Sequence, residues 1–175
     1  MKPNHWKSAR LAAALAMLAL AGTADAREVE GWNVLPQDDT CFMSSAFEDD
    51  VTLAVIWNPA TRDLAFMAAG NALRGLRGSN GKQVSFDLAF GGRTRPGSWT
   101  DDTAVVIETD GGAVGVIAKW SDGQSSELAD AIAAASGVSI TVGDMDLGAF
   151  ALTGIPAAYR ELMRCGDTLA AGGKS

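Results

Sequence analysis

The stretch FALTGIPAAYRELMRC, residues 150–165, predicts a strand that runs into an amphipathic helix and ends on a cysteine. Its apolar residues recur with the 3.6-residue period of an α-helix, so they share one helical face. Pro156 falls in the expected first turn, where proline is tolerated. The apolar face consists of Ile155, Ala158, Tyr159, Leu162 and Cys165. We therefore expect Cys165 on the buried side of the last helix.

The N-terminus has the three parts of a secretory signal peptide. Three basic residues precede an apolar run of eleven residues, Leu11 to Ala21, and Ala24-Asp25-Ala26 provides a small-x-small cleavage site. Eleven helical residues are too short to cross a hydrocarbon core of about 30 Å. We predict a signal peptide over 1–26, cleavage near Ala26, no membrane span, and a periplasmic or secreted protein.

The part of the chain after residue 26 is acidic and has no histidine. The whole chain has 14 basic and 21 acidic residues, of which three basic and one acidic lie in the predicted signal. The remaining 11 basic and 20 acidic residues give a net charge of −9. This charge argues against nucleic acid as a partner. The single histidine, His5, lies in the signal, which excludes Ser-His-Asp triads and imidazole zinc sites from the exported part.

Two cysteines, Cys41 and Cys165, lie near opposite ends of the expected domain. In an exported chain, two cysteines most simply form one disulfide bond. In the chain-entropy description, a bond that closes a loop of about 125 residues stabilises the fold by about 4–5 kcal/mol. The alternative is a pair of buried thiols. A catalytic thiol is disfavoured because the chain lacks a CxxC motif and a histidine that could activate the thiol.

Short runs of alternating apolar residues predict a β-rich fold, and residues 84–90 alternate most cleanly. Turn residues between neighbouring runs predict hairpins around 58–61 and 109–112. A helical pattern over 127–135 ends at Gly137. The expected strands are 41–47, 51–57, 64–69, 84–90, 104–108, 113–119, 138–142 and 147–152.

These elements predict the α+β class, with a single β-rich domain. We expect an antiparallel sheet or sandwich of about seven or eight strands with two short helices, the last of which is pinned by the disulfide. The domain is expected over 41–165, after a lead-in at 27–40 and before a flexible tail at 166–175.

The order and spacing of three segments resemble the invasion-associated locus B family, a group of small exported proteins of Gram-negative bacteria. The segments are Cys41-Phe42-Met43-Ser44-Ser45, Leu128 to Val142, and Phe150-x-Leu152-x-Gly154-x-x-Ala157 continuing to Leu162-x-x-Cys165. The resemblance covers roughly residues 41–165, departs from the family at 93–102, and includes no catalytic motif. It implies an exported protein, this type of fold and a terminal disulfide.

The best candidate for a binding surface is basic and includes one tryptophan. Residues 71–95 carry five basic residues and one acid, so they form a local positive segment in an acidic chain. The predicted surface consists of Arg74, Arg77, Arg93, Arg95 and Trp99, with Trp99 in an exposed loop. The alternative is a solvated loop beside the 84–90 strand. The glycines at 75–81 lack the spacing of a phosphate-binding loop.

Acidic clusters give weaker candidates for chemistry. Glu48-Asp49-Asp50, Asp101-Asp102 and Asp144-x-Asp146 fall in expected turns and lack the pattern of a calcium loop. We predict no metal site, no cofactor and no catalytic residues. The predicted function is an exported periplasmic binding or accessory protein, with an unknown protein or an anionic envelope component as partner. The alternatives are a protein that binds anionic glycolipid at the outer membrane and a hydrolase with a carboxylate pair.

Overall fold

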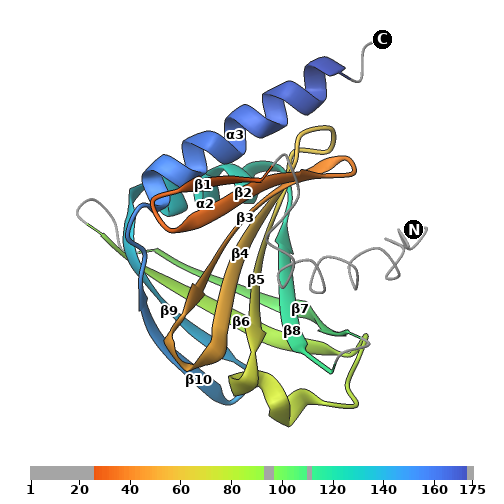
Figure 1. Cartoon of the computed structure of the whole chain (residues 1–175). Coiled ribbons are helices and arrows are strands. Elements are labelled where there is room, and N and C mark those ends of the chain that lie inside the picture. Colours follow the sequence, from red (N-terminus) through yellow and green to blue (C-terminus); the bar gives the residue numbers. More distant parts are fainter. Residues whose placement is uncertain (1–25, 93–96, 110–111, 173–175) are drawn as a thin grey trace.

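A computed structural model describes residues 26–92, 97–109 and 112–172, in which ten strands form one antiparallel sheet (Figure 1). The order across the sheet is β1-β2-β3-β4-β5-β8-β7-β6-β9-β10. The strands are β1 (Arg27–Val29), β2 (Trp32–Gln37), β3 (Thr40–Phe47), β4 (Val51–Asn58), β5 (Asp63–Gly70), β6 (Gln83–Gly92), β7 (Gly97–Glu108), β8 (Val114–Trp120), β9 (Ala135–Val142) and β10 (Met145–Ala151). The helices are α2 (Asp122–Ala134) and α3 (Ile155–Gly172), with short 3-10 helices η1 (Glu48–Asp50) and η2 (Asn71–Leu76).

The β-rich antiparallel fold is confirmed, but the expected count of seven or eight strands was too low. The lead-in at 27–40 contains β1 and β2, which the turn residues around Pro36 concealed. Pro36 pairs with Cys41 of β3 on one side, but β1 on the other side pairs only with residues 32–34, so Pro36 lies beyond the end of the edge strand, where proline is tolerated. The other difference is β7, which begins at Gly97 and includes residues expected in a loop.

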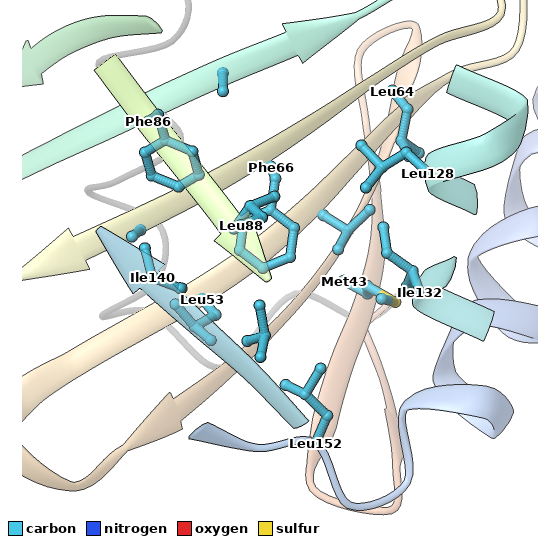
Figure 2. Packing of buried hydrophobic residues seen from close by; sticks show 14 of the residues in the cluster. Met43, Leu53, Leu64, Phe66, Phe86, Leu88, Leu128, Ile132, Ile140 and Leu152 are labelled. Atoms are coloured by element: carbon cyan, nitrogen blue, oxygen red, sulfur yellow. The ribbon is translucent and has the colours of Figure 1, made fainter. Parts of the chain in front are cut away.

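The sheet curls so strongly that its inner face packs against itself. The ring of Phe66 on β5 lies 6.3 Å from that of Phe86 and 6.1 Å from that of Phe90, both on β6. Strands β8 and β7 lie between β5 and β6 in the sheet, so this contact requires the sheet to bend round. Figure 2 shows the resulting core, which Leu128 and Ile132 of α2 join. This face supplies most of the apolar burial of the domain.

The last helix crosses β2 and β3 and is held there by three different contacts. Cys165 on α3 forms a disulfide bond with the fully buried Cys41 on β3, with their Cα atoms 6.1 Å apart. The indole N–H of Trp32 donates a hydrogen bond to the carbonyl oxygen of Thr153, 2.9 Å away, just before the helix. On the surface, Arg27 forms an ion pair of 2.7 Å with Glu161. The predicted disulfide and its position on the last helix are therefore confirmed.

The helix α3 is longer than its sequence indicated. It continues to Gly172 and so includes most of the segment 166–175, where we expected a tail. Gly166 lies inside the helix and is buried against Trp57. The packing is so close that a Cβ atom at this position would lie 2.7 Å from the indole ring. Because glycine is unfavourable inside helices, its presence in the sequence favours the prediction that the helix ends there. None of the helices in the described ranges combines the length and apolar composition that crossing a membrane requires.

The turn into α3 depends on a glycine. Gly154 has a φ of +77°, and a Cβ atom there would lie 2.6 Å from the carbonyl oxygen of Glu30. The backbone of the β1–β2 turn therefore packs directly on the start of the helix. Gly148 on β10 has a φ of +94° but has open space around it, so it shares the backbone strain without the contact.

We predict that Gly154→Ala destabilises the domain more than Gly148→Ala. Both substitutions force a left-handed conformation on alanine, which lowers the free energy of unfolding by about 1–2 kcal/mol. Gly154→Ala also displaces the β1–β2 turn, as an overpacked side chain does in a core, and we expect this to lower the free energy of unfolding by about 1–3 kcal/mol more. Urea unfolding monitored by tryptophan fluorescence measures both variants against the unmodified chain. Equal losses of stability would show that the turn does not constrain the helix.

Candidate functional site

The two described arginines of the predicted basic surface lie on the connection between β5 and β6. Arg74 is exposed in η2, and Arg77 is exposed just after it. The Arg77 guanidinium donates a hydrogen bond of 3.3 Å to the carbonyl oxygen of Gly112. Farther along, the backbone N–H of Gly81 donates to the carbonyl oxygen of Val106, 2.8 Å away. The connection therefore lies beside the end of β7 and the start of β8.

Trp99 occupies a different environment from the one predicted. It lies in β7 opposite Leu88 of β6, whereas we expected an exposed loop. Its side chain is half-buried, and its ring meets that of Phe90 edge to face with centroids 5.5 Å apart. The absence of a side chain at Gly97 gives the indole room, because a Cβ atom there would lie 2.1 Å from the ring. The expectation of an exposed aromatic loop was wrong, since much of Trp99 packs on the core.

The described members of the predicted surface do not lie together. The connection that carries Arg77 bonds to Val106, near the C-terminal end of β7. Val106 is seven residues along this strand from Trp99. At about 3.3 Å per residue, these positions are roughly 23 Å apart. Arg93 and Arg95 lie outside the described residues. The described members thus fall into two separate places, with Arg74 and Arg77 at one end of β7 and Trp99 at the other.

Sequence reasoning missed a second apolar surface, which lies on the outer face of the sheet, opposite the helices. We call it the outer cluster. Its buried members come from four adjacent strands and are Ala54, Ile56, Ala65, Met67, Ala69, Ile107 and Ile117, with Phe42 and Val105 at its margin. The two α-helices within the described ranges, α2 and α3, contribute to the inner core and place no residue in this cluster. Strands β4, β5 and β8 are therefore apolar on both faces, a pattern typical of strands with a layer on each side.

Charged groups border one end of the outer cluster. The Lys119 ammonium lies 2.6 Å from the carboxylate of Asp63, and the backbone N–H of Lys119 donates a hydrogen bond of 3.1 Å to Asp101. The other half of the outer face, on β6 and β9, carries polar side chains such as Asp87 and Ser139. The outer face is thus apolar over its first half and polar over its second.

The acidic clusters do not combine into a metal site in the part of the chain that the structure describes. That part contains no group of three or more histidine, cysteine or acidic residues placed to hold an ion. Two of these acids instead accept hydrogen bonds from backbone N–H groups two residues further along the chain. Asp101 accepts a hydrogen bond of 2.8 Å from the backbone N–H of Thr103, and Asp146 accepts one of 2.8 Å from that of Gly148.

Searches of protein-family models, curated proteins and solved structures find no match to this chain. The resemblance to the invasion-associated locus B family accordingly stays a prediction from the order and spacing of its segments.

Burial displaces the pKa of the single tyrosine. Tyr159 lies on α3, and burial raises its pKa from 10.0 to about 12, with a further contribution from the negative charge of Asp130 on α2. The neutral phenol is therefore favoured in the folded state. The burial of the neutral phenol contributes to the stability of the fold fully below pH 10, and this contribution is lost as the pH rises through about 12.

We predict that the folded chain shows no tyrosinate absorbance until well above pH 10, and that the denatured chain titrates near 10. Because the chain has one tyrosine, absorbance at alkaline pH reports this side chain alone. Asp130→Asn should lower the folded pKa without changing the denatured value, whereas Asp167→Asn, farther along α3, should leave both unchanged. A folded chain that titrates near 10 would contradict the buried position of the phenol.

Proposed function

We propose that this chain is an exported periplasmic binding or accessory protein without catalytic activity. The observation that carries the proposal is the outer cluster, a set of buried apolar residues on four adjacent strands, on the face of the sheet opposite the described helices. Strands that are apolar on both faces are typical of a sheet with a layer on each side, and a partner protein can supply such a layer. Export and a terminal disulfide, both expected from the sequence, fit such a role because the bond stabilises a domain that works outside the cytoplasm.

The arrangement favours a protein surface as the ligand. An apolar centre with a border of charged groups, here Asp63, Lys119 and Asp101, resembles the core and rim of protein interfaces. The cluster lies on strands and presents small side chains such as Ala54 and Ala65, so a helix or a second sheet can approach closely. We therefore propose an apolar helix or sheet face of a partner protein as the ligand of the exported domain.

A photo-crosslinking amino acid in place of Ile117 tests this surface. We predict that the exported domain carrying it forms a discrete adduct with one envelope protein upon illumination in cells. The matched control places the same amino acid at Ser139, which is exposed on the polar half of the outer face. Adducts at both positions, or at neither, would count against the outer cluster as the binding surface.

A second candidate function is the binding of an anionic glycolipid. The supporting observation is that Arg74, Arg77 and Lys82 are all exposed within a stretch of nine residues. Such a group attracts phosphate through screened electrostatic forces. We predict that vesicles with anionic glycolipid then bind the domain at low salt, and that Arg74→Glu with Arg77→Glu abolishes the binding. Binding that persists at high salt or in this double variant would exclude this mode.

A further inference from the structure

Strand β10 forms one edge of the sheet and, within the described ranges, pairs with β9 alone. The backbone N–H of Leu152, just after β10, donates to the carbonyl oxygen of Ser136 on β9. Because successive residues of a strand direct their backbone groups to opposite sides, alternate residues of β10 turn away from β9. Ala149 and Ala151 are two of these residues, and both are exposed. Their short side chains leave the backbone N–H and carbonyl groups accessible to another strand.

Strand β3 has a free edge of the same kind beyond the end of β2. Strand β2 pairs with residues 40–44 of β3, and residues 45–47 extend past it. The pair Gln37–Thr40 closes the two-residue turn between these strands, so the even-numbered residues of β3 turn toward the β2 side. Ala46 is therefore the residue that directs its backbone groups to this free edge, and it is exposed.

The curl of the sheet brings the two free edges toward each other across a narrow opening, which we call the seam. The ring of Phe47 on β3 meets that of Phe150 on β10, with centroids 5.3 Å apart, and both rings pack against the inner core. The two strands themselves do not pair. Two phenylalanine side chains that meet in this way separate their strands by roughly 10 Å, twice the spacing of paired strands. The seam therefore has the width of one further strand and an aromatic floor.

The seam is bounded at both ends. At one end lies the β1–β2 turn, where the Ser45 hydroxyl donates a hydrogen bond of 2.9 Å to the carbonyl oxygen of Gly31. The neighbouring residue of this turn, Glu30, packs against Gly154, just after β10. At the other end, the sulfur of Met145 lies against η2. Between these ends, the free edge of β10 is about four residues, or about 13 Å, long.

The middle of the seam lacks the features that usually block a sheet edge. Natural edges are protected by bulges, prolines and charged side chains. Strand β10 has a bulge between Asp146 and Gly148, but residues 148–151 (GAFA) contain neither proline nor a charged residue. Exposed carboxylates lie at the ends instead, with Glu30 at one end and Glu48 and Asp146 at the other. The seam is thus an uncharged edge between two negatively charged ends.

We propose that the seam binds an extended, basic segment of a partner protein, which joins the sheet as a strand antiparallel to β10. The backbone of the segment bonds to Ala149 and Ala151 on one side and to Ala46 on the other. Because side chains alternate between the faces of a strand, alternate residues of the segment are apolar and pack on Phe47 and Phe150. The basic residues between them interact with the carboxylates at the ends. Strand addition of this kind takes its affinity from main-chain hydrogen bonds.

The width and charge of the seam favour this occupant over a second copy of the chain. An opening one strand wide and closed at both ends has no room for the edge of a folded sheet. Arg74 of η2 offsets part of the negative charge at one end, but the chain after residue 26 has a net charge of −9 and repels its own copies. The seam lies on other strands than the outer cluster, so it does not rest on the proposed function, and either can fail alone.

Binding of a synthetic peptide to the full chain, with its disulfide intact, tests the proposal. The probe is a fluorescein-labelled peptide of alternating lysine and valine, and fluorescence anisotropy at low salt gives its dissociation constant. Ala149→Pro should weaken binding by about tenfold, because the edge loses a hydrogen bond and the proline ring obstructs the added strand. Glu28→Pro is the matched control, since it places proline on the opposite edge strand, β1, at an exposed residue. It should leave the affinity unchanged.

Amide hydrogen exchange of the unmodified chain locates the peptide without any substitution. The amides of Ala46, Ala149 and Ala151 should exchange more slowly when the peptide is bound, and that of Glu28 should not change. A peptide that is N-methylated at each valine should not bind, because it lacks donors along one edge. Three results would overturn the proposal: slowed exchange at Glu28 alone, equal binding of the N-methylated peptide, or equal binding of a peptide with glutamate in place of lysine.

Discussion

The disulfide bond between Cys41 and Cys165 constrains the whole domain, because it ties the third strand to the last helix. That helix contacts β2 and β3 on one flank of the curled sheet and β9 on the other. It therefore bridges strands that lie far apart in the order of the sheet. The aromatic rings of Phe47 on β3 and Phe150 on β10 are also in contact, with centroids 5.3 Å apart, so this pair joins the same two flanks of the sheet that the helix bridges. The curl of the sheet and the position of α3 support each other.

Much of this architecture could be predicted because its signals are local. The alternation at Val84 to Phe90, the hairpin turn at 58–61 and the apolar stripe of Ile155 to Cys165 each reflect a periodicity that backbone geometry imposes. Strand β2 was missed because it contains Pro36 and is followed by Asp38 and Asp39, which are typical of turns, and β1 was missed because it has only three residues. The full length of α3 was missed because Gly166 serves close packing against Trp57 there, a contact that sequence does not reveal.

The candidate surface was harder to predict because proximity in sequence did not mean proximity in space. Arg77 lies beside the end of β7, whereas Trp99 lies near the start of the same strand. The outer cluster did leave a signal in the amino-acid sequence. Ala54 and Ile56 occupy the positions of β4 where a strand with one solvated face would carry polar side chains. Residues of this kind make a strand apolar on both faces, and that composition indicates a second layer over the sheet.

The place of the two cysteines in the chain has a consequence for its synthesis. A ribosome makes Cys41 long before Cys165, which follows 124 residues later. Until the last helix is made, Cys41 has no correct partner within its own molecule. Because the chain has no third cysteine, an early oxidation error cannot scramble the pairing within one molecule and can only join Cys41 to a thiol of another molecule. Correct oxidation thus reports that the chain has been completed to its final helix.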